Sequence, residues 1–398
     1  MASKNNNNDT HKVGLFLKGK MDYSVILIVL ILLICGMIIL ISASGPISLK
    51  EVGNTYSYVK KQIAFIIAGF VGMFIVSKID YRFLKRHRII TSLIYIITLA
   101  VLAYVGIMGK EVKGARRWLE IGGNTFQPSE IAKVTFIVFY GIVLSNIYDA
   151  GKIKKLCPGF IFPLASFIPT FIIMYKLQNH MSCTAFMGII LVAQMFIAGS
   201  GLFKFILSGG VGTLGLWLVS KFAPSNRNFR TGRLEAWLNF AEADTKGGAY
   251  QINQSLYAIA SGGMFGAGPG QSIQKYSYLP EAQNDFIFSI FAEEFGFVGC
   301  TLIILLFAVF VWRGITIALK ANDMSGTLIA IGVTVLIGIE AAMNIAVVTN
   351  TGPVTGVLLP FFSYGGSGMV ANLVAVGFLL AVSRNSRIKE SKKGNEEN

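Results

Sequence analysis

Long runs of apolar residues recur along this chain and limit what it can fold into. Most of them reach the roughly 20 residues that a helix needs to cross a bilayer. Only 14% of the 398 residues are charged, against about a quarter in soluble domains, and 54% are apolar. A soluble core stops growing at about 250–300 residues and could not bury so much apolar surface. We therefore predict an all-α, polytopic membrane protein with ten transmembrane helices, at residues 24–43, 62–77, 89–108, 131–148, 158–175, 184–199, 205–222, 286–312, 326–349 and 368–383.

The distribution of Lys and Arg predicts which side of the membrane each segment faces. Residues 78–88, residues 152–155 and the tail that follows the last run are rich in Lys and Arg, and such short segments stay in the cytoplasm. Both chain ends are then cytoplasmic. The predicted organisation is a cytoplasmic tail over 1–23, a transmembrane domain over 24–383 with a long extracytoplasmic loop at about 223–285, and a second cytoplasmic tail over 384–398.

The net charge of +15 does not indicate a nucleic-acid partner, because the excess of cations in cytoplasmic loops must be subtracted first. Basic residues also fall on the predicted outer side, among them Arg116, Arg117, Lys133 and Lys275. Long loops cross the membrane whatever their charge, so these cations need no function. The alternative is an external site for an anionic substrate, such as a lipid head group that bears phosphates. The four cysteines have no CxxC spacing, so we predict neither a disulfide nor a metal cluster.

Asp285 is a candidate for chemistry because it stands just before an apolar run, at the predicted outer end of a membrane span. On spacing alone, the favoured interpretation is a helix N-cap, since Asn and Asp satisfy the free amides of a first helical turn. The functional interpretation is a carboxylate that accepts a proton from a substrate hydroxyl. A carboxylate here would also suit Mg²⁺, which needs only one or two carboxylates beside substrate oxygens.

A second cluster of polar residues lies between the third and fourth predicted spans. Glu130 and Lys133 are three residues apart and are expected to pair on one face of a helix. The alternative is that Arg116, Arg117 and Lys133 reach a diphosphate, with Trp118 at the membrane interface.

Three acidic residues are predicted to lie within membrane spans. Glu293 and Glu294 would be costly against lipid, so they should face the bundle or pair with cations. Glu340 lies deeper, with Asn344 one turn later, and is equally compatible with a functional carboxylate and with a hydrogen-bonded packing residue. The Gly- and Ser-rich stretch at 353–368 predicts irregular backbone, which is tolerated at membrane depth only where it is buried or lines a cavity.

Four groups of motifs are specific enough to indicate a family. They are Gly114–Trp118 with Gln127–Glu130 and Lys133; Tyr250–Gln251 with Gln254–Ser255 and Ser261–Gly263; Gly270–Ser272 with Gln274–Lys275, Leu279–Ala282 and Asp285–Phe288; and Pro360–Phe361 with Ser363–Ser367. With them the chain resembles, over nearly its whole length, the bacterial SEDS proteins (shape, elongation, division and sporulation). The Leu-Pro-Glu-Ala form resembles the division and sporulation branch more than the elongation branch.

The resemblance implies a multi-pass protein of the bacterial cytoplasmic membrane that polymerises lipid II into glycan strands on the outer face, during division or sporulation. It implies a class B penicillin-binding protein transpeptidase and other division or sporulation membrane proteins as partners, with no nucleic acid. A divalent cation, Mg²⁺ or Mn²⁺, is the only cofactor implied. Asp285 is the implied catalytic carboxylate and the candidate metal ligand. The candidate residues for binding the sugar or diphosphate are Arg116, Arg117, Trp118, Gln127, Glu130, Lys133, Gln271, Ser272, Lys275, Glu281, Ser363 and Tyr364.

Two other functions remain open from the sequence. A lipid II flippase would use the same outer cations, with Glu340 as a relay in the membrane. A non-catalytic scaffold would only recruit a transpeptidase. The chain also departs from the family pattern, because residues 178–182 lack an acid that many members carry there, and Glu340 stands where an uncharged residue is usual.

Overall fold

The protein was analysed as a computed structural model that describes residues 21–112, 115–121, 124–201, 204–205, 237 and 248–396, with side chains to residue 386. In this part of the chain, nine helical segments are long and apolar enough to cross a membrane. They are α1 (Tyr23–Val52), α2 (Ser57–Lys78), α4 (Arg88–Met108), α5 (Pro128–Asp149), the segment Cys157–Leu177, α7 (Met181–Ala198), α11 (Ile287–Leu319), α12 (Met324–Val348) and the first part of α13 (Gly366–Glu396). Nine predicted spans are thus confirmed, while the span predicted at 205–222 falls almost wholly outside the described residues.

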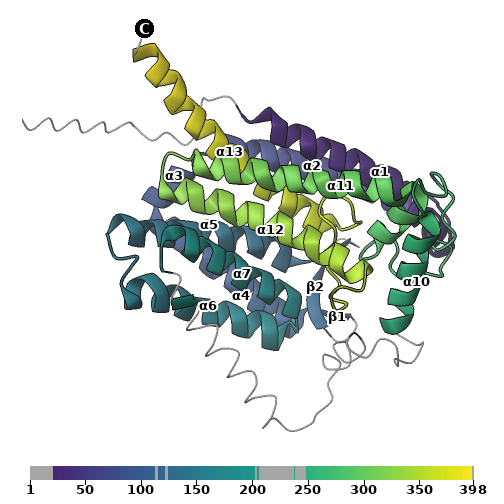
Figure 1. Ribbon diagram of the computed structural model, residues 1–398. Helices are drawn as coiled ribbons and strands as arrows, with labels where there is room; N and C mark the ends of the chain where they lie inside the picture. The colour runs from purple at the N-terminus through teal and green to yellow at the C-terminus, as the bar shows by residue number, and fades with distance from the viewer. Residues whose placement is uncertain are drawn as a thin grey trace, which may run out of the picture.

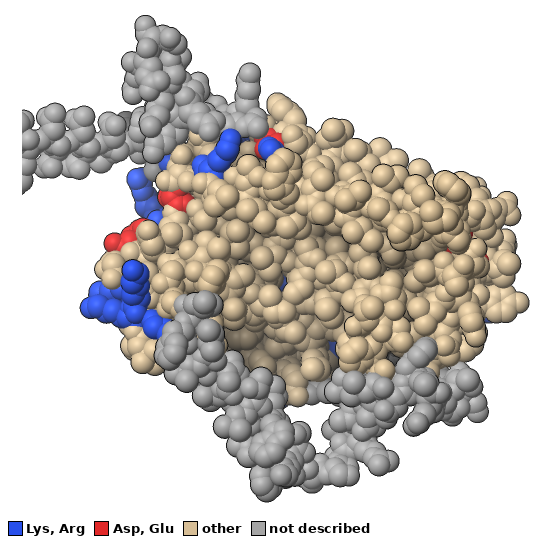
Figure 2. Space-filling view, viewed as in Figure 1, with Lys and Arg blue, Asp and Glu red and all other residues tan. Residues whose placement is uncertain are grey.

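The spanning helices lie roughly along one direction and form a bundle (Figure 1). The short helix α3 (Tyr81–Arg86) lies at one end, and α10 (Gly248–Gly262) crosses the opposite end. On the face that Figure 2 shows, Lys and Arg gather at the α3 end. The positive-inside rule assigns this end to the cytoplasm, so the α10 end is called the outer end below.

Helix α13 forms the centre of the bundle, since 78% of its spanning window is buried. It packs most closely on α2, where small residues let the two backbones approach. A Cβ atom added at Gly377 of α13 would fall only 2.7 Å from the carbonyl oxygen of Met73 in α2. Helix α12 packs on α5, α7 and α11, so the two last spans connect both halves of the bundle.

A small antiparallel sheet at the outer end is a feature that the sequence analysis did not predict. Strands β1 (Lys110–Val112), β2 (Ala115–Ile121) and β3 (Asn124–Phe126) lie in the order β1-β2-β3 between α4 and α5. Two of the strands have only three residues, too few for an alternating pattern to be recognised. The sheet carries the predicted Arg116, Arg117 and Trp118 on its central strand.

The fifth span is irregular and contains three prolines, Pro158, Pro163 and Pro169. It is built from η1 (Cys157–Ile161), α6 (Phe162–Ile172) and η2 (Ile173–Leu177), so π-helical turns occupy both of its ends. Pro163 lies in the first turn of α6 and Pro169 lies inside it. Proline has no backbone N–H and cannot complete the usual ladder, which accounts for the change of helical type.

Helix α11 is broken near its outer end at Gly296, whose φ of 66° and ψ of −168° are not helical. The backbone groups freed by the break are satisfied by the segment that follows α10. The amide of Phe297 donates to the carbonyl of Gly263 (2.9 Å), and the amide of Ala267 donates to the carbonyl of Glu293 (2.9 Å). A Cβ atom at position 296 would lie 2.3 Å from the amide nitrogen of Gly266, so this docking requires glycine. The break therefore fixes the start of the segment that leads to Asp285.

Candidate functional site

Asp285 lies at the outer end of the bundle, half-buried and two residues before α11. Asp285 is not the N-cap predicted from spacing, because Phe286 occupies the N-cap position of α11. The backbone here is held from α12 instead. The Nδ2 atom of Asn344 donates to the carbonyls of Asp285 (2.8 Å) and Val357 (2.7 Å). Asn344 thus joins the start of α11 to the irregular segment before α13.

The side chain of Asp285 faces a glycine turn in that segment. Residues 350–365 form no helix, which confirms the predicted irregular backbone over 353–365, whereas residues 366–368 already belong to α13. Gly356 has a φ of 67°, and a Cβ atom added to it would lie 3.3 Å from Oδ2 of Asp285. The positive φ is favourable only for glycine, and the missing side chain leaves room beside the carboxylate.

The interior of the bundle holds a buried ionic cluster. The Nζ atom of Lys133 lies 2.8 Å from Oε2 of Glu130, which confirms the predicted pair, and it also contacts Oε1 of Glu340. Asn372 of α13 donates to the other oxygen of Glu340 (3.2 Å). Lys133 and Glu340 are 4% and 3% exposed. Glu340 is therefore an interior residue that forms an ion pair. The ammonium of Lys133 is shared between the carboxylates of Glu130 and Glu340.

This cluster borders a cavity of about 50 Å³. Such a volume accommodates a water molecule or two but no diphosphate. Burial, together with Arg117 and Lys133, lowers the pKa of His180 well below its ordinary value, so this lining residue is neutral. Gly356 lines the cavity and also faces the carboxylate of Asp285. This glycine therefore lies between the cavity and Asp285. Further lining residues are Gln127, Ser182, Cys183, Phe186, Ser363 and Met369.

The two arginines that were predicted to bind a diphosphate lie on β2, where they contact neighbouring backbone and side-chain groups. Arg116 is exposed, and its guanidinium lies 3.3 Å from the carboxylate of Glu111. Arg117 donates to the carbonyl oxygens of Gln178 (3.2 Å) and Asn179. Trp118 lies half-buried on the same strand. Arg117 thus anchors the loop before α7, the loop in which the sequence departs from the family pattern.

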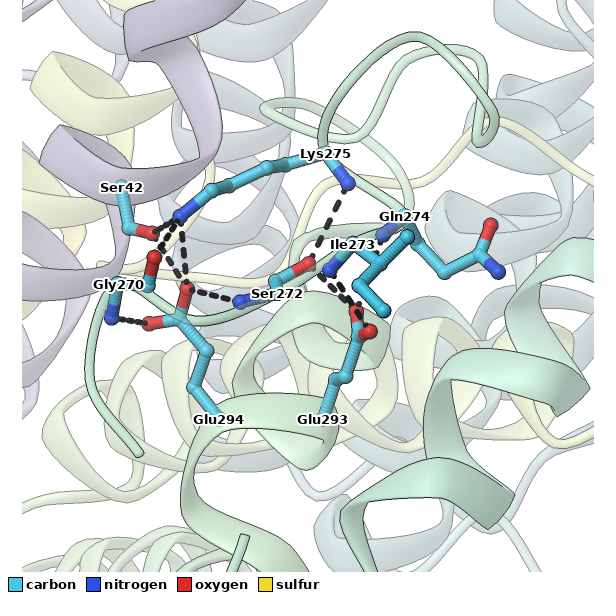
Figure 3. A network of polar contacts seen from close by, with 8 residues as sticks. All are labelled: Ser42, Gly270, Ser272, Ile273, Gln274, Lys275, Glu293 and Glu294. Atoms are coloured by element: carbon cyan, nitrogen blue, oxygen red, sulfur yellow. Dashed lines mark hydrogen bonds and ion pairs between the residues drawn. The ribbon is translucent and has the colours of Figure 1, made fainter. Parts of the chain in front are cut away.

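The first turns of α11 carry a second polar cluster, shown in Figure 3. Oxygen atoms of Glu294 accept hydrogen bonds from the amides of Gly270 (2.9 Å) and Ser272 (3.3 Å) and from the hydroxyl of Ser42 in α1 (2.5 Å). The ammonium of Lys275 lies 3.4 Å from the same carboxylate. The predicted pairing of Glu294 with a cation is therefore confirmed.

Glu293 holds the same loop from the neighbouring position. Its carboxylate accepts from the hydroxyl of Ser272 (2.5 Å) and from the amides of Ile273 (2.9 Å) and Gln274 (3.4 Å). We call Glu293, Glu294, Ser272, Lys275 and Ser42 the carboxylate latch. The predicted binding residues Ser272 and Lys275 belong to this latch, and Gln271 is exposed beside it.

A larger depression, the outer cleft, has a volume of about 560 Å³ and is lined in part by residues that directly precede Asp285 in the chain. Its inner wall is braced by Ser363, whose hydroxyl donates to the carbonyl of Asn284 (2.7 Å) and accepts from the amide of Leu359 (2.8 Å). Of the predicted site residues, Glu281, Ser363 and Tyr364 are thus brought together near Asp285. The cleft is lined by Ile47, Glu51, Val52, Ser57, Tyr58, Lys61, Thr125, Pro280, Glu281, Gln283, Asn284 and Tyr364.

Gln62 is a site residue that the sequence analysis missed. It is 1% exposed in α2, donates to the carbonyl of Ser363 (3.1 Å) and accepts from the amide of Gly365 (3.3 Å). It therefore holds the turn that carries Tyr364. The available signal was an uncharged polar residue at the first position of an apolar run, where it can find a partner within the bundle.

Comparison with known proteins agrees with this architecture. The family model described as cell cycle protein, for FtsW, RodA and SpoVE, matches residues 23–388. The chain belongs to this family. The chain is 39% identical to stage V sporulation protein E of Bacillus subtilis strain 168, over 92% of its own length and 98% of that protein. It is 35% identical to the probable peptidoglycan glycosyltransferase FtsW of Geobacter strain M18, over 92% and 97%.

Solved structures show the same fold. One of them comes from work described as "Structural coordination of polymerization and crosslinking by a peptidoglycan synthase complex". A chain of that structure aligns with a TM-score of 0.75 and is 23% identical, and the alignment covers 92% of this protein and 98% of that chain. The crystal structure of the rod shape determining protein RodA of Thermus thermophilus aligns with a TM-score of 0.63 and 24% identity, over 92% and 97%. The predicted resemblance is confirmed, and the chain is a multi-pass protein of the cytoplasmic membrane.

The buried cluster in the bundle gives a first prediction. Replacing Lys133 with Met leaves the carboxylates of Glu130 and Glu340 without their shared counter-charge. Breaking a buried ion pair in this way costs about 3–5 kcal/mol, so the free energy of unfolding should fall by that amount. Adding Glu340→Gln to Lys133→Met should recover part of the loss. Thermal unfolding of the purified variants in detergent measures both effects, and a Lys133→Met protein as stable as wild type would contradict the assignment.

Proposed function

We propose that this chain polymerises lipid II into glycan strands on the outer face of the cytoplasmic membrane, during cell division or sporulation. The chain is a peptidoglycan glycosyltransferase by family, since relatives that carry this name align over nearly their whole length. One observation carries the proposed mechanism. The carboxylate of Asp285 is half-buried at the outer end of the bundle and faces a glycine turn, and the residue directly follows a segment that lines a polar cleft.

In the proposed reaction Asp285 accepts the proton of a sugar hydroxyl on one lipid-linked disaccharide. The freed oxygen forms a bond to the anomeric carbon of the growing chain, and the bond from that carbon to the diphosphate breaks. The diphosphate leaves with the electron pair and needs no proton, so the second carboxylate used by many glycosidases is not required. A well-placed general base typically contributes about 10²–10⁴-fold to the rate. The expected product has an inverted anomeric centre.

At this site the protein offers a divalent cation one candidate ligand, the carboxylate of Asp285. In the described ranges no three His, Cys, Asp or Glu side chains converge on a point. Asp285 would provide one carboxylate, and diphosphate oxygens and water would complete the shell, an arrangement that Mg²⁺ accepts. When bound, Mg²⁺ or Mn²⁺ would offset the charge of the leaving diphosphate. The lysines that were predicted to bind the diphosphate, Lys133 and Lys275, are instead ion-paired with glutamates.

A class B penicillin-binding protein transpeptidase is the partner that we propose. The support is that one chain of the same fold comes from a complex described as coordinating polymerization and crosslinking. Other division or sporulation membrane proteins are proposed as further partners.

The test is a polymerisation assay with the purified protein in liposomes that contain lipid II, with the products separated by length. We expect glycan strands from the protein alone or with a class B transpeptidase. Translocation of lipid II across the same liposomes without chain growth would favour the flippase alternative. Recruitment of the transpeptidase with neither activity would favour the scaffold.

A further inference from the structure

We propose that the outer cleft binds the uncharged sugar of the acceptor substrate and excludes the diphosphate. This inference rests on the proposed function and deepens it, since it assigns one part of the substrate to one surface. The cleft lies between the end of α1 and the start of α2 on one side and residues 280–284 on the other. Residues 280–284 directly precede Asp285 in the chain, so this wall of the cleft leads to the proposed base.

The size of the cleft fits a carbohydrate. Ligand sites usually enclose about 300–1,000 Å³. The outer cleft, at about 560 Å³, lies in this range, whereas the buried cavity beside Lys133 has only about 50 Å³. Of these two hollows, the outer cleft is the one that accommodates a sugar ring.

The charge of the cleft opposes a diphosphate. Its lining contains two carboxylates, on Glu51 and Glu281, and one ammonium, on Lys61. The lining is therefore net negative, and a diphosphate carries several negative charges of its own. A sugar has no charge, and its hydroxyls can donate hydrogen bonds to carboxylate oxygens.

The aromatic and amide groups of the cleft are those that bind sugars. The rings of Tyr58 and Tyr364 meet edge to face, with centroids 4.8 Å apart, and offer apolar surface beside polar tips. The hydroxyl of Tyr58 donates to Glu51 (2.6 Å), which orients that carboxylate. The amides of Gln283 and Asn284 also belong to the lining. Together these groups offer stacking surface and hydrogen-bonding groups within one hollow.

The wall of the cleft is also fixed before any substrate arrives. Glu281 has a φ of 56°, which is unfavourable for a residue other than glycine and persists only where the surroundings hold it. Its carboxylate accepts from Nδ2 of Asn284 (2.7 Å), and the amide of Tyr364 donates to the carbonyl of Gln283 (2.9 Å). A preorganised wall lowers the cost of ordering on binding.

The experiment measures binding without turnover. The probe is the labelled disaccharide of the substrate, freed of its lipid and diphosphate, in equilibrium dialysis against the purified full-length protein. We expect Glu281→Gln to weaken binding about tenfold, because a hydrogen bond to a charged group is lost. Tyr364→Phe should weaken it severalfold. An excess of inorganic diphosphate should not displace the disaccharide.

The matched control is Glu120→Gln, which removes an exposed carboxylate that pairs with Lys110 on the outer sheet and does not line the cleft. It should bind the disaccharide as the wild type does, and thermal unfolding should show that Tyr364→Phe remains folded. No binding by the wild type, unchanged binding by Glu281→Gln and Tyr364→Phe, or displacement by diphosphate would each overturn the inference. Since this readout needs no catalysis, a failure of polymerisation would instead count against the proposed function.

Discussion

Replacing Glu294 with Gln is expected to lower the free energy of unfolding by about 3–5 kcal/mol and to reduce polymerisation at least tenfold. The carboxylate of Glu294 accepts hydrogen bonds from the amides of Gly270 and Ser272 and forms an ion pair with the ammonium of Lys275. Glutamine would keep the shape but leave the ammonium buried without a counter-charge, which is the costly way to break a buried ion pair. The amide group would also present a donor where donors already converge.

The loss of activity follows from what the latch holds. The latched residues 270–275 lead through residues 276–279 to residues 280–284, which contribute one wall of the outer cleft and directly precede Asp285. A loosened latch therefore leaves the cleft and the proposed base less well positioned relative to each other. Hydrogen exchange of peptides over 270–285 should rise in the variant, in parallel with the fall in thermal stability.

Two further variants separate charge from shape. Ser42→Ala removes one hydroxyl donor to Glu294 and should cost only about 1 kcal/mol. Combining Glu294→Gln with Lys275→Met removes both charges and should recover part of the stability. A Glu294→Gln protein that unfolds and polymerises like wild type would show that the latch does not hold this loop.

The membrane spans and the Glu130–Lys133 ion pair were predictable from the sequence, because the thickness of the bilayer and the length of one helical turn determine them. The bilayer thickness sets the length of an apolar helix, and nine predicted spans agree with the structure. Glu130 and Lys133 are one helical turn apart, so their pairing needs no knowledge of the fold. The cost of a charge in lipid likewise required that Glu293 and Glu294 face inward.

Contacts between distant parts of the chain were not predictable. The second partner of Lys133 is Glu340, and the hydroxyl that reaches Glu294 comes from Ser42 in the first helix. Periodicity does not say which helices are neighbours. The break at Gly296 was hidden as well, because a glycine inside an apolar run resembles any packing glycine of a membrane helix.

The structure also bears on the flippase alternative. A relay in the membrane needs an acidic group that can exchange its partners. Glu340 is instead engaged by Lys133 and Asn372, beside a cavity of about 50 Å³. These contacts favour a structural role for Glu340, and they leave the outer end as the place for chemistry.

Asp285→Asn is the substitution with the largest expected effect on activity. Asparagine has nearly the same shape, so the backbone bond from Asn344 and the space beside Gly356 should be kept. It cannot accept the proton of a sugar hydroxyl as a carboxylate does. Loss of a general base typically costs about 10²–10⁴-fold in rate. Folding and binding of the disaccharide should remain.

The initial rate of lipid II polymerisation by purified Asp285→Asn, beside the wild type and Glu120→Gln, tests this account most directly. Samples are matched for thermal stability so that a difference in rate reports chemistry. The account predicts that Asp285→Asn is at least about 100-fold slower, while Glu120→Gln polymerises like the wild type. An Asp285→Asn protein that polymerises lipid II at the wild-type rate would contradict it.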